Sequence, residues 1–213
     1  MSGLPIVYAP QYAIDIGPHV FPMRKYALIL DRLLGDGVIA RADIYEPEWA
    51  IESDVHRVHD RGYATRLCEG RLTLEEIVQL EMPWSPALAD FAWRAAGGTV
   101  ATAQRAVTHG LAAHIGGGFH HAFPDHGEGF CALHDVAIAL RRVLHDGAIE
   151  RAVVVDLDVH QGNGTAAIFV GDRRVFTFSM HQENNYPRVK PPSDLDLGLD
   201  DGTEGEGDRK SVV

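Results

Sequence analysis

The sequence predicts an α/β fold built on a parallel sheet. Short apolar runs rich in β-branched residues alternate along the chain with longer segments of helical periodicity. A helix that follows a strand returns the chain to the same end of the sheet, so successive strands of this kind pair in parallel. Two of the apolar runs also lead into Gly-rich turns that carry histidines or acids, and α/β proteins place their ligands in such turns.

Local signals mark where the helices begin and end. The first predicted helix stops at the Gly-Asp-Gly turn that starts at Gly35. Thr73 and Glu76 have the spacing of a capping box at the start of the next helix. Residues 85–109 form either one helix or two helices interrupted at the Gly-Gly pair of residues 97–98. The predicted helices are residues 23–34, 73–80, 85–109, 132–145 and 165–170.

Four short apolar runs predict the strands. The run at residues 151–155 is mostly valine, which is typical of a strand buried in a parallel sheet. The predicted strands are residues 5–8, 112–115, 151–155 and 175–179. Residues 193–213 are acidic and Gly-rich, so we expect a tail there, after a single domain at residues 1–192.

Composition narrows the class of protein. A chain of 213 residues with 46% hydrophobic content suits one globular domain, and it has no run long enough to span a bilayer. The net charge of -11 argues against direct nucleic-acid binding. Two cysteines, Cys68 and Cys131, give no disulfide framework, and the start lacks the pattern of a signal peptide. We therefore expect a cytoplasmic protein without a membrane partner.

The most informative segment follows the strand at residues 151–155. Asp156, Asp158 and His160 occupy alternate positions, and alternate side chains of an extended segment lie on the same side. A carboxylate and an imidazole held two residues apart are suitable ligands for a zinc-like ion. The Gly-x-Gly that follows predicts a tight turn, so the sequence indicates a metal site at the end of this strand.

A second segment has the same organisation. Three glycines follow the strand at residues 112–115, and the adjacent histidines His120 and His121 come directly after them. Because a parallel sheet gathers the carboxyl ends of its strands at one edge, we expect residues 117–122 and 156–163 to meet there. A metal ion together with two imidazoles is suited to hydrolysis, since the metal activates water and the histidines move protons.

Three motifs in this order and spacing closely resemble the zinc-dependent histone deacetylase family. They are GGFHHA at residues 117–122, GEGFC at 127–131 and DLDVHQGNG at 156–164. The last motif carries Asn163 where most members carry aspartate, which is similar to the class IV branch and its bacterial relatives. GGT at residues 97–99 and SDLDLG at 193–198 also resemble that branch. The resemblance implies an arginase/deacetylase-type fold, a three-layer parallel sheet, and removal of acetyl or other acyl groups from lysine side chains.

The same resemblance assigns metal-binding roles. It makes Asp158 and His160 two of the family's three protein ligands of one catalytic zinc ion. It also implies that Asp156 orients His120 and binds a structural monovalent cation, such as K⁺, together with Ser179.

The resemblance assigns the remaining site residues as well. His121 is expected to act as general base and acid, with His120 as its electrostatic partner. Asn163 is expected to orient His121 as an uncharged hydrogen-bond acceptor. Phe130 and Tyr186 are expected to form opposite walls of a tunnel for the acyl-lysine chain. The carbonyl of Gly129 is expected to accept a hydrogen bond from the substrate amide.

Two functional residues of the family have no counterpart in this sequence. In the family, the third zinc ligand and the tyrosine that stabilises the oxyanion lie further downstream. We therefore expect a chain that lacks the C-terminal strands of the fold and carries bare strand edges. Unpaired backbone groups are costly, so the 213-residue chain alone should be aggregation-prone, inactive and poor at holding zinc.

The sequence leaves other functions open. A related hydrolase could act on a small acylated amine such as an acetylpolyamine. A two-manganese ureohydrolase is disfavoured because Gly162 stands where that class needs a second carboxylate. A catalytically dead or truncated binding protein is the alternative from another class, and the DNA that follows the codon for Gly202 would distinguish it from an enzyme.

Overall fold

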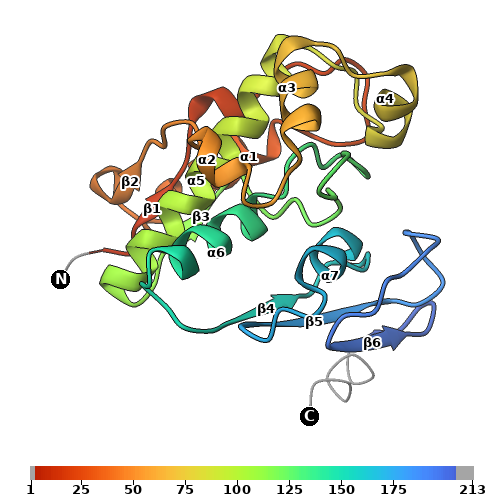
Figure 1. Ribbon diagram of the computed structural model, residues 1–213. Helices are drawn as coiled ribbons and strands as arrows, with labels where there is room; N and C mark the ends of the chain where they lie inside the picture. The colour runs from red at the N-terminus through yellow and green to blue at the C-terminus, as the bar shows by residue number, and fades with distance from the viewer. Residues whose placement is uncertain (1–2, 205–213) are drawn as a thin grey trace. The chain divides into compact units, whose positions relative to one another are not determined.

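The computed structural model of the chain describes residues 3–204 and has an α/β architecture (Figure 1). The chain divides into two compact units, Met1–Ile149 and Glu150–Val213. The described strands form one three-stranded sheet in each unit, with the order β2-β1-β3 in the first and β4-β5-β6 in the second. Neighbouring strands in both sheets are parallel, which confirms the predicted fold class and pairing.

The sheet of the first unit is small. It consists of β1 (Ile6–Val7), β2 (Ile44–Tyr45) and β3 (Ala113–His114), and β1 is buried between its two neighbours. The strands predicted at residues 5–8 and 112–115 are therefore confirmed in shorter form. The sequence did not predict β2, because it has two residues and only partial burial and so leaves no periodic signal.

Within residues 3–149, six α-helices accompany this sheet. Helices α5 and α6 pack along each other, as the ribbon shows (Figure 1). Thr73 accepts a hydrogen bond from the Glu76 amide at 3.2 Å, and the Glu76 carboxylate accepts one from the Thr73 amide at 2.7 Å. The predicted capping box is thus confirmed. The helices are α1 (Lys25–Gly35), α2 (Glu52–Val55), α3 (Arg61–Glu69), α4 (Leu74–Leu80), α5 (Pro86–His109) and α6 (Asp135–His145).

Helix α5 is continuous through its Gly-Gly pair. The alternative of two helices interrupted at residues 97–98 is therefore wrong. A Cβ added at Gly97 would lie 2.0 Å from the carbonyl oxygen of Glu48. This glycine lets the loop before α2 pack directly on the helix, and helical hydrogen bonding tolerates the residue in the middle of a long, buried segment.

The second unit follows the predicted order closely. It contains β4 (Ala152–Asp156), α7 (Asn163–Phe169), β5 (Val175–Gln182) and β6 (Leu195–Leu199). In the register of the sheet, Ser179 of β5 lies opposite Asp156 of β4 and Asp196 of β6. The strands predicted at residues 151–155 and 175–179 and the helix at 165–170 are confirmed within a few residues.

Two features of this unit differ from expectation. Residues 195–199 form β6, in the segment expected to be a tail, because their backbone continues the parallel ladder of β5; residues 205–213 lie outside the described part. β4 was expected to be buried, but Val153 and Val155 are exposed. Among residues 150–204 the structure describes a single helix, α7, which packs against β5, so a helix covers one face of the sheet.

Candidate active site

The tandem histidines lie in the loop that follows β3. His121 is buried and His120 is half-buried, and the centroids of their rings are 4.0 Å apart with a tilt of 45°. The two imidazoles therefore form one contiguous polar group after a strand of the first unit, where the sequence predicted them.

A buried carboxylate holds the backbone of this loop. Asp135, the first residue of α6, is fully buried. Its Oδ1 accepts a hydrogen bond from the Phe119 amide at 2.7 Å, and its Oδ2 accepts one from the Gly118 amide at 2.9 Å. The helix N-terminus also favours a negative charge at this position. Asp135 thus fixes the two residues that directly precede His120.

A chain of hydrogen bonds leads from Asp135 into the core. The hydroxyl of Thr99 donates to Oδ2 of Asp135 at 2.5 Å and lies 2.8 Å from Nδ1 of His114, whose Nε2 lies 2.8 Å from the hydroxyl of Tyr12. Burial lowers the pKa of His114 to about 4, so this ring is neutral at neutral pH. A Cβ at Gly117 would lie 2.4 Å from the Asp135 carboxylate and 2.6 Å from both Thr99 and His114. The loop therefore passes directly over the network.

Sequence reasoning missed this network. The sequence singles out none of His114, Tyr12 and Asp135 as site residues. The contacting residues come from four distant parts of the sequence, so no local spacing could reveal them.

Gly129 and Phe130, both predicted to bind the substrate, adopt positive φ, at 52° and 68°. The Phe130 amide donates to the carbonyl of Leu80 at 2.9 Å, which anchors this unusual backbone. The Phe130 ring meets the His19 ring edge to face, with centroids 5.0 Å apart, and lies 5.8 Å from the Phe21 ring. Phe130 is thus part of an aromatic cluster that includes His19, a histidine that the sequence did not single out.

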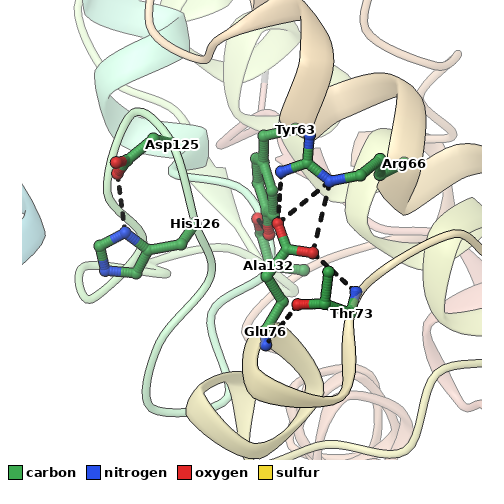
Figure 2. Close-up of polar contacts among 7 residues, drawn as sticks. All are labelled: Tyr63, Arg66, Thr73, Glu76, Asp125, His126 and Ala132. Carbon is green, nitrogen blue, oxygen red and sulfur yellow. Dashed lines mark hydrogen bonds and ion pairs between the residues drawn. The ribbon is translucent and has the colours of Figure 1, made fainter.

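Helices α3 and α4 support the segment that follows Phe130. The buried hydroxyl of Tyr63 donates to the carbonyl of Ala132 at 2.7 Å (Figure 2). Arg66, one turn further along α3, pairs with Glu76, which also receives the Thr73 amide (Figure 2). The capped start of α4 is thereby joined to the helix that holds Ala132.

Two further histidines, His126 and His134, lie in the segment that follows the tandem pair. His126 contacts Asp125 at 2.7 Å (Figure 2). Its Nε2 lies 3.6 Å from the Glu128 carboxylate, and the interaction with Glu128 is the main cause of its raised pKa. His134 is fully buried, its Nδ1 accepts the amide of Ala137 at 3.2 Å, and burial lowers its pKa. His126 is therefore biased toward the cation, and His134 toward the neutral ring.

The predicted zinc ligands lie together at the end of β4. Oδ1 of Asp158 accepts the His160 amide at 2.8 Å and lies 3.1 Å from Nδ1 of the His160 ring. Asp156 accepts the Asp158 amide at 3.0 Å, which fixes the turn. The ring of Tyr186 meets the His160 ring edge to face, with centroids 5.8 Å apart. The structure thus brings Tyr186, a predicted tunnel residue, beside a predicted ligand.

The predicted cation ligands are also neighbours. Asp156 and Ser179 lie opposite each other in the parallel pair of β4 and β5. Ser179 is buried, and its hydroxyl lies 2.9 Å from Nδ1 of His181. Asn163 begins α7 and is buried. A cavity of about 260 Å³ within this unit is lined in part by Asp158 and His181.

The donor chemistry at Asp158 and His160 fits zinc, but their number does not complete a site. Catalytic zinc usually has three protein ligands. Among residues 3–204, no group of three or more His, Cys, Asp or Glu side chains is arranged to hold a metal ion. The expectation that residues 117–122 meet residues 156–163 concerns two separate units and stays a prediction.

Comparison with known proteins decides the family. The family model described as "Histone deacetylase domain" matches residues 19–208. The chain belongs to the histone deacetylase family. An uncharacterized protein of Picosynechococcus sp. is 47% identical over 96% of this chain and 69% of its own length. Histone deacetylase 2 of Arabidopsis thaliana is 30% identical over 88% of this chain and 51% of its own length.

Solved structures show the same fold for this histone deacetylase family member. The crystal structure of an HDAC homolog from Aquifex aeolicus superimposes with a TM-score of 0.75 and 21% identity, over 93% of this chain and 59% of that one. The chain therefore spans about half to two thirds of the length of these relatives. In the part that the structure describes, no helix is both long and apolar enough to cross a membrane.

Proposed function

We propose that this member of the histone deacetylase family is a zinc-dependent hydrolase that removes acetyl or other acyl groups from lysine side chains. The observation that carries the proposal is the contact between the Asp158 carboxylate and the His160 imidazole at the end of β4, 3.1 Å apart, in a chain of this family. Zinc, when bound by these residues, would polarise the acyl carbonyl and make its bound water acidic.

The tandem histidines are proposed to move the protons. His121 takes a proton from the attacking water and later gives it to the departing lysine amine. His120, whose ring lies 4.0 Å from that of His121, is its electrostatic partner. The burial of His121 supports this division, because a proton carrier works best where bulk water does not compete.

The aromatic side chains are proposed to enclose the substrate. A lysine side chain presents four apolar methylene groups before its acylated nitrogen, and flat aromatic rings suit such a stem. Phe130, packed against His19, and Tyr186, packed against His160, supply such rings. The Gly129 carbonyl is proposed to accept the hydrogen bond of the substrate amide.

The test uses a protein whose deacetylase domain has the full length of its relatives, called the intact protein from here on, because the 213-residue chain alone is expected to be inactive. It compares variants of that protein by acetate release from an acetyl-lysine peptide. We expect His121→Ala to lower kcat about a hundredfold or more, since general acid–base catalysis contributes on that scale, and His120→Ala to have a smaller effect. Asp158→Ala should lose both activity and bound zinc. The exposed His145, at the end of α6, provides the control, and His145→Ala should retain both.

Three results would contradict parts of the proposal. Equal losses from His120→Ala and His121→Ala would mean that the roles of the pair are wrongly assigned. Full zinc content in Asp158→Ala would remove that residue from the metal site. Faster turnover of an acetylpolyamine than of the peptide would replace the proposed substrate class with a small acylated amine.

A further inference from the structure

We propose that Asp135 is a positioning residue for the tandem histidines and acts through the backbone of their loop. The inference rests on the proposed function for its kinetic part, but its structural part can be tested without any activity. It is carried by one buried carboxylate that receives three hydrogen bonds, two of them from the amides of Gly118 and Phe119 just before His120.

The contacts that Asp135 makes with the loop and with Thr99 are strong. Asp135 is fully buried, and its two oxygens receive the Thr99 hydroxyl at 2.5 Å and the two amides at 2.9 and 2.7 Å. Hydrogen bonds to a carboxylate are roughly twice as strong as neutral ones, and they gain further strength away from water. The loop backbone is therefore tied to the start of α6 at two consecutive residues.

The hydrogen bonds on the core side of Asp135 have a defined direction. Because the Thr99 hydroxyl donates to the carboxylate, its oxygen is available to accept the proton on Nδ1 of His114. The neutral His114 ring then has an unprotonated Nε2, which accepts the Tyr12 hydroxyl. Each donor in this series of hydrogen bonds faces an acceptor, so the contacts with buried core residues fix the orientation of the Asp135 carboxylate.

The loop passes so close to this network that no side chain fits at residue 117. A Cβ at Gly117 would lie within 2.6 Å of the polar atoms of Asp135, Thr99 and His114. The loop can approach this closely only with glycine at the position. The backbone is therefore fixed at Gly117, three and four residues before the tandem histidines. This matters for catalysis because small displacements of catalytic groups lower rates steeply.

The experiment replaces the carboxylate without changing its shape. Asp135→Asn puts an amide N–H₂ against at least one of the three donors, so the loop should detach from α6. Hydrogen exchange of the Gly118 and Phe119 amides, measured by NMR on the intact protein, should speed up roughly tenfold or more. With an acetyl-lysine peptide, kcat should fall about tenfold to a hundredfold while KM stays unchanged.

A matched control separates positioning from general stability. Asp54 is also a buried carboxylate, which pairs with Arg142 of α6 at 2.9 Å. Asp54→Asn should lower the melting temperature but leave the exchange of the two loop amides and kcat close to wild type.

A second pair of variants keeps the proposal testable if Asp135→Asn does not fold. Thr99→Val removes the hydroxyl that orients the carboxylate and should speed up exchange of the two amides. Thr99→Ser keeps a hydroxyl at this position and should leave their exchange at the wild-type rate. Unchanged exchange in both Asp135→Asn and Thr99→Val would overturn the proposal. Faster exchange in a protein without deacylase activity would instead support the positioning role and contradict the proposed function.

Discussion

Lowering the pH from about 7.5 to about 5 is expected to destabilise the protein through histidines that are buried as neutral rings. His59 and His114 each have a pKa lowered from 6.5 to about 4, with burial as the largest cause. Nε2 of His59 accepts the His134 amide at 2.9 Å, so protonation would place a donor against a donor. The pKa of His134 is lowered in the same direction.

The sign follows from proton binding in the two states. Between pH 6.5 and about 4, the unfolded chain binds protons at these rings and the folded protein does not, so the free energy of unfolding falls as the pH falls. At about pH 5, each of the two rings lowers it by about 2 kcal/mol relative to neutral pH. A total near 4 kcal/mol is a large share of the roughly 5–15 kcal/mol that holds a typical domain together.

The assay is urea unfolding followed by circular dichroism at several pH values across this window. His59→Gln should reduce the fall in the free energy of unfolding by about 2 kcal/mol across the window, while the same change at the exposed His109 should leave the pH dependence unchanged. A free energy of unfolding that stays constant across the window would refute the assignment of neutral buried rings. The same slope in His59→Gln as in wild type would also refute it.

Two further substitutions test the scaffold of the candidate site. Gly117→Ala places a methyl group 2.4 Å from the Asp135 carboxylate. We expect it to lower the free energy of unfolding by about 1–3 kcal/mol, measured by chemical denaturation. An unchanged free energy of unfolding would show that the loop does not pass over the network. Tyr63→Phe removes the 2.7 Å hydrogen bond to the carbonyl of Ala132 and should lower the free energy of unfolding by about 1–3 kcal/mol, measured in the same way. A change below about 0.5 kcal/mol would mean that another donor reaches this carbonyl.

The sequence predicted those elements whose signals are local. The valine run before Asp156 and the capping box at Thr73 each lie within a few residues, and both correspond to observed elements. Asp158 and His160 are close in space because they are two residues apart in one turn. Spacing of this kind is sufficient to predict that the two side chains are neighbours.

The remaining features depend on contacts between distant residues. β6 forms because Leu195–Leu199 pairs with β5; its three leucines alternate, but the acidic, Gly-rich residues of the whole 193–213 segment led to the prediction of a tail. The contact of His19 with Phe130 joins residues that are far apart in the chain. The same holds for the Thr99–Asp135 hydrogen bond, which is made between α5 and α6. No pattern within a short window contains these pairings, so they could be found only in the fold.

The central claim is that Asp158 and His160 serve a metal-dependent deacylation. It is tested most directly by acetate release from an acetyl-lysine peptide, measured with the intact protein before chelation, after exhaustive chelation and after zinc is returned. We predict that chelation abolishes turnover and that about one equivalent of zinc per chain restores it. Turnover that survives complete removal of metal would contradict the claim.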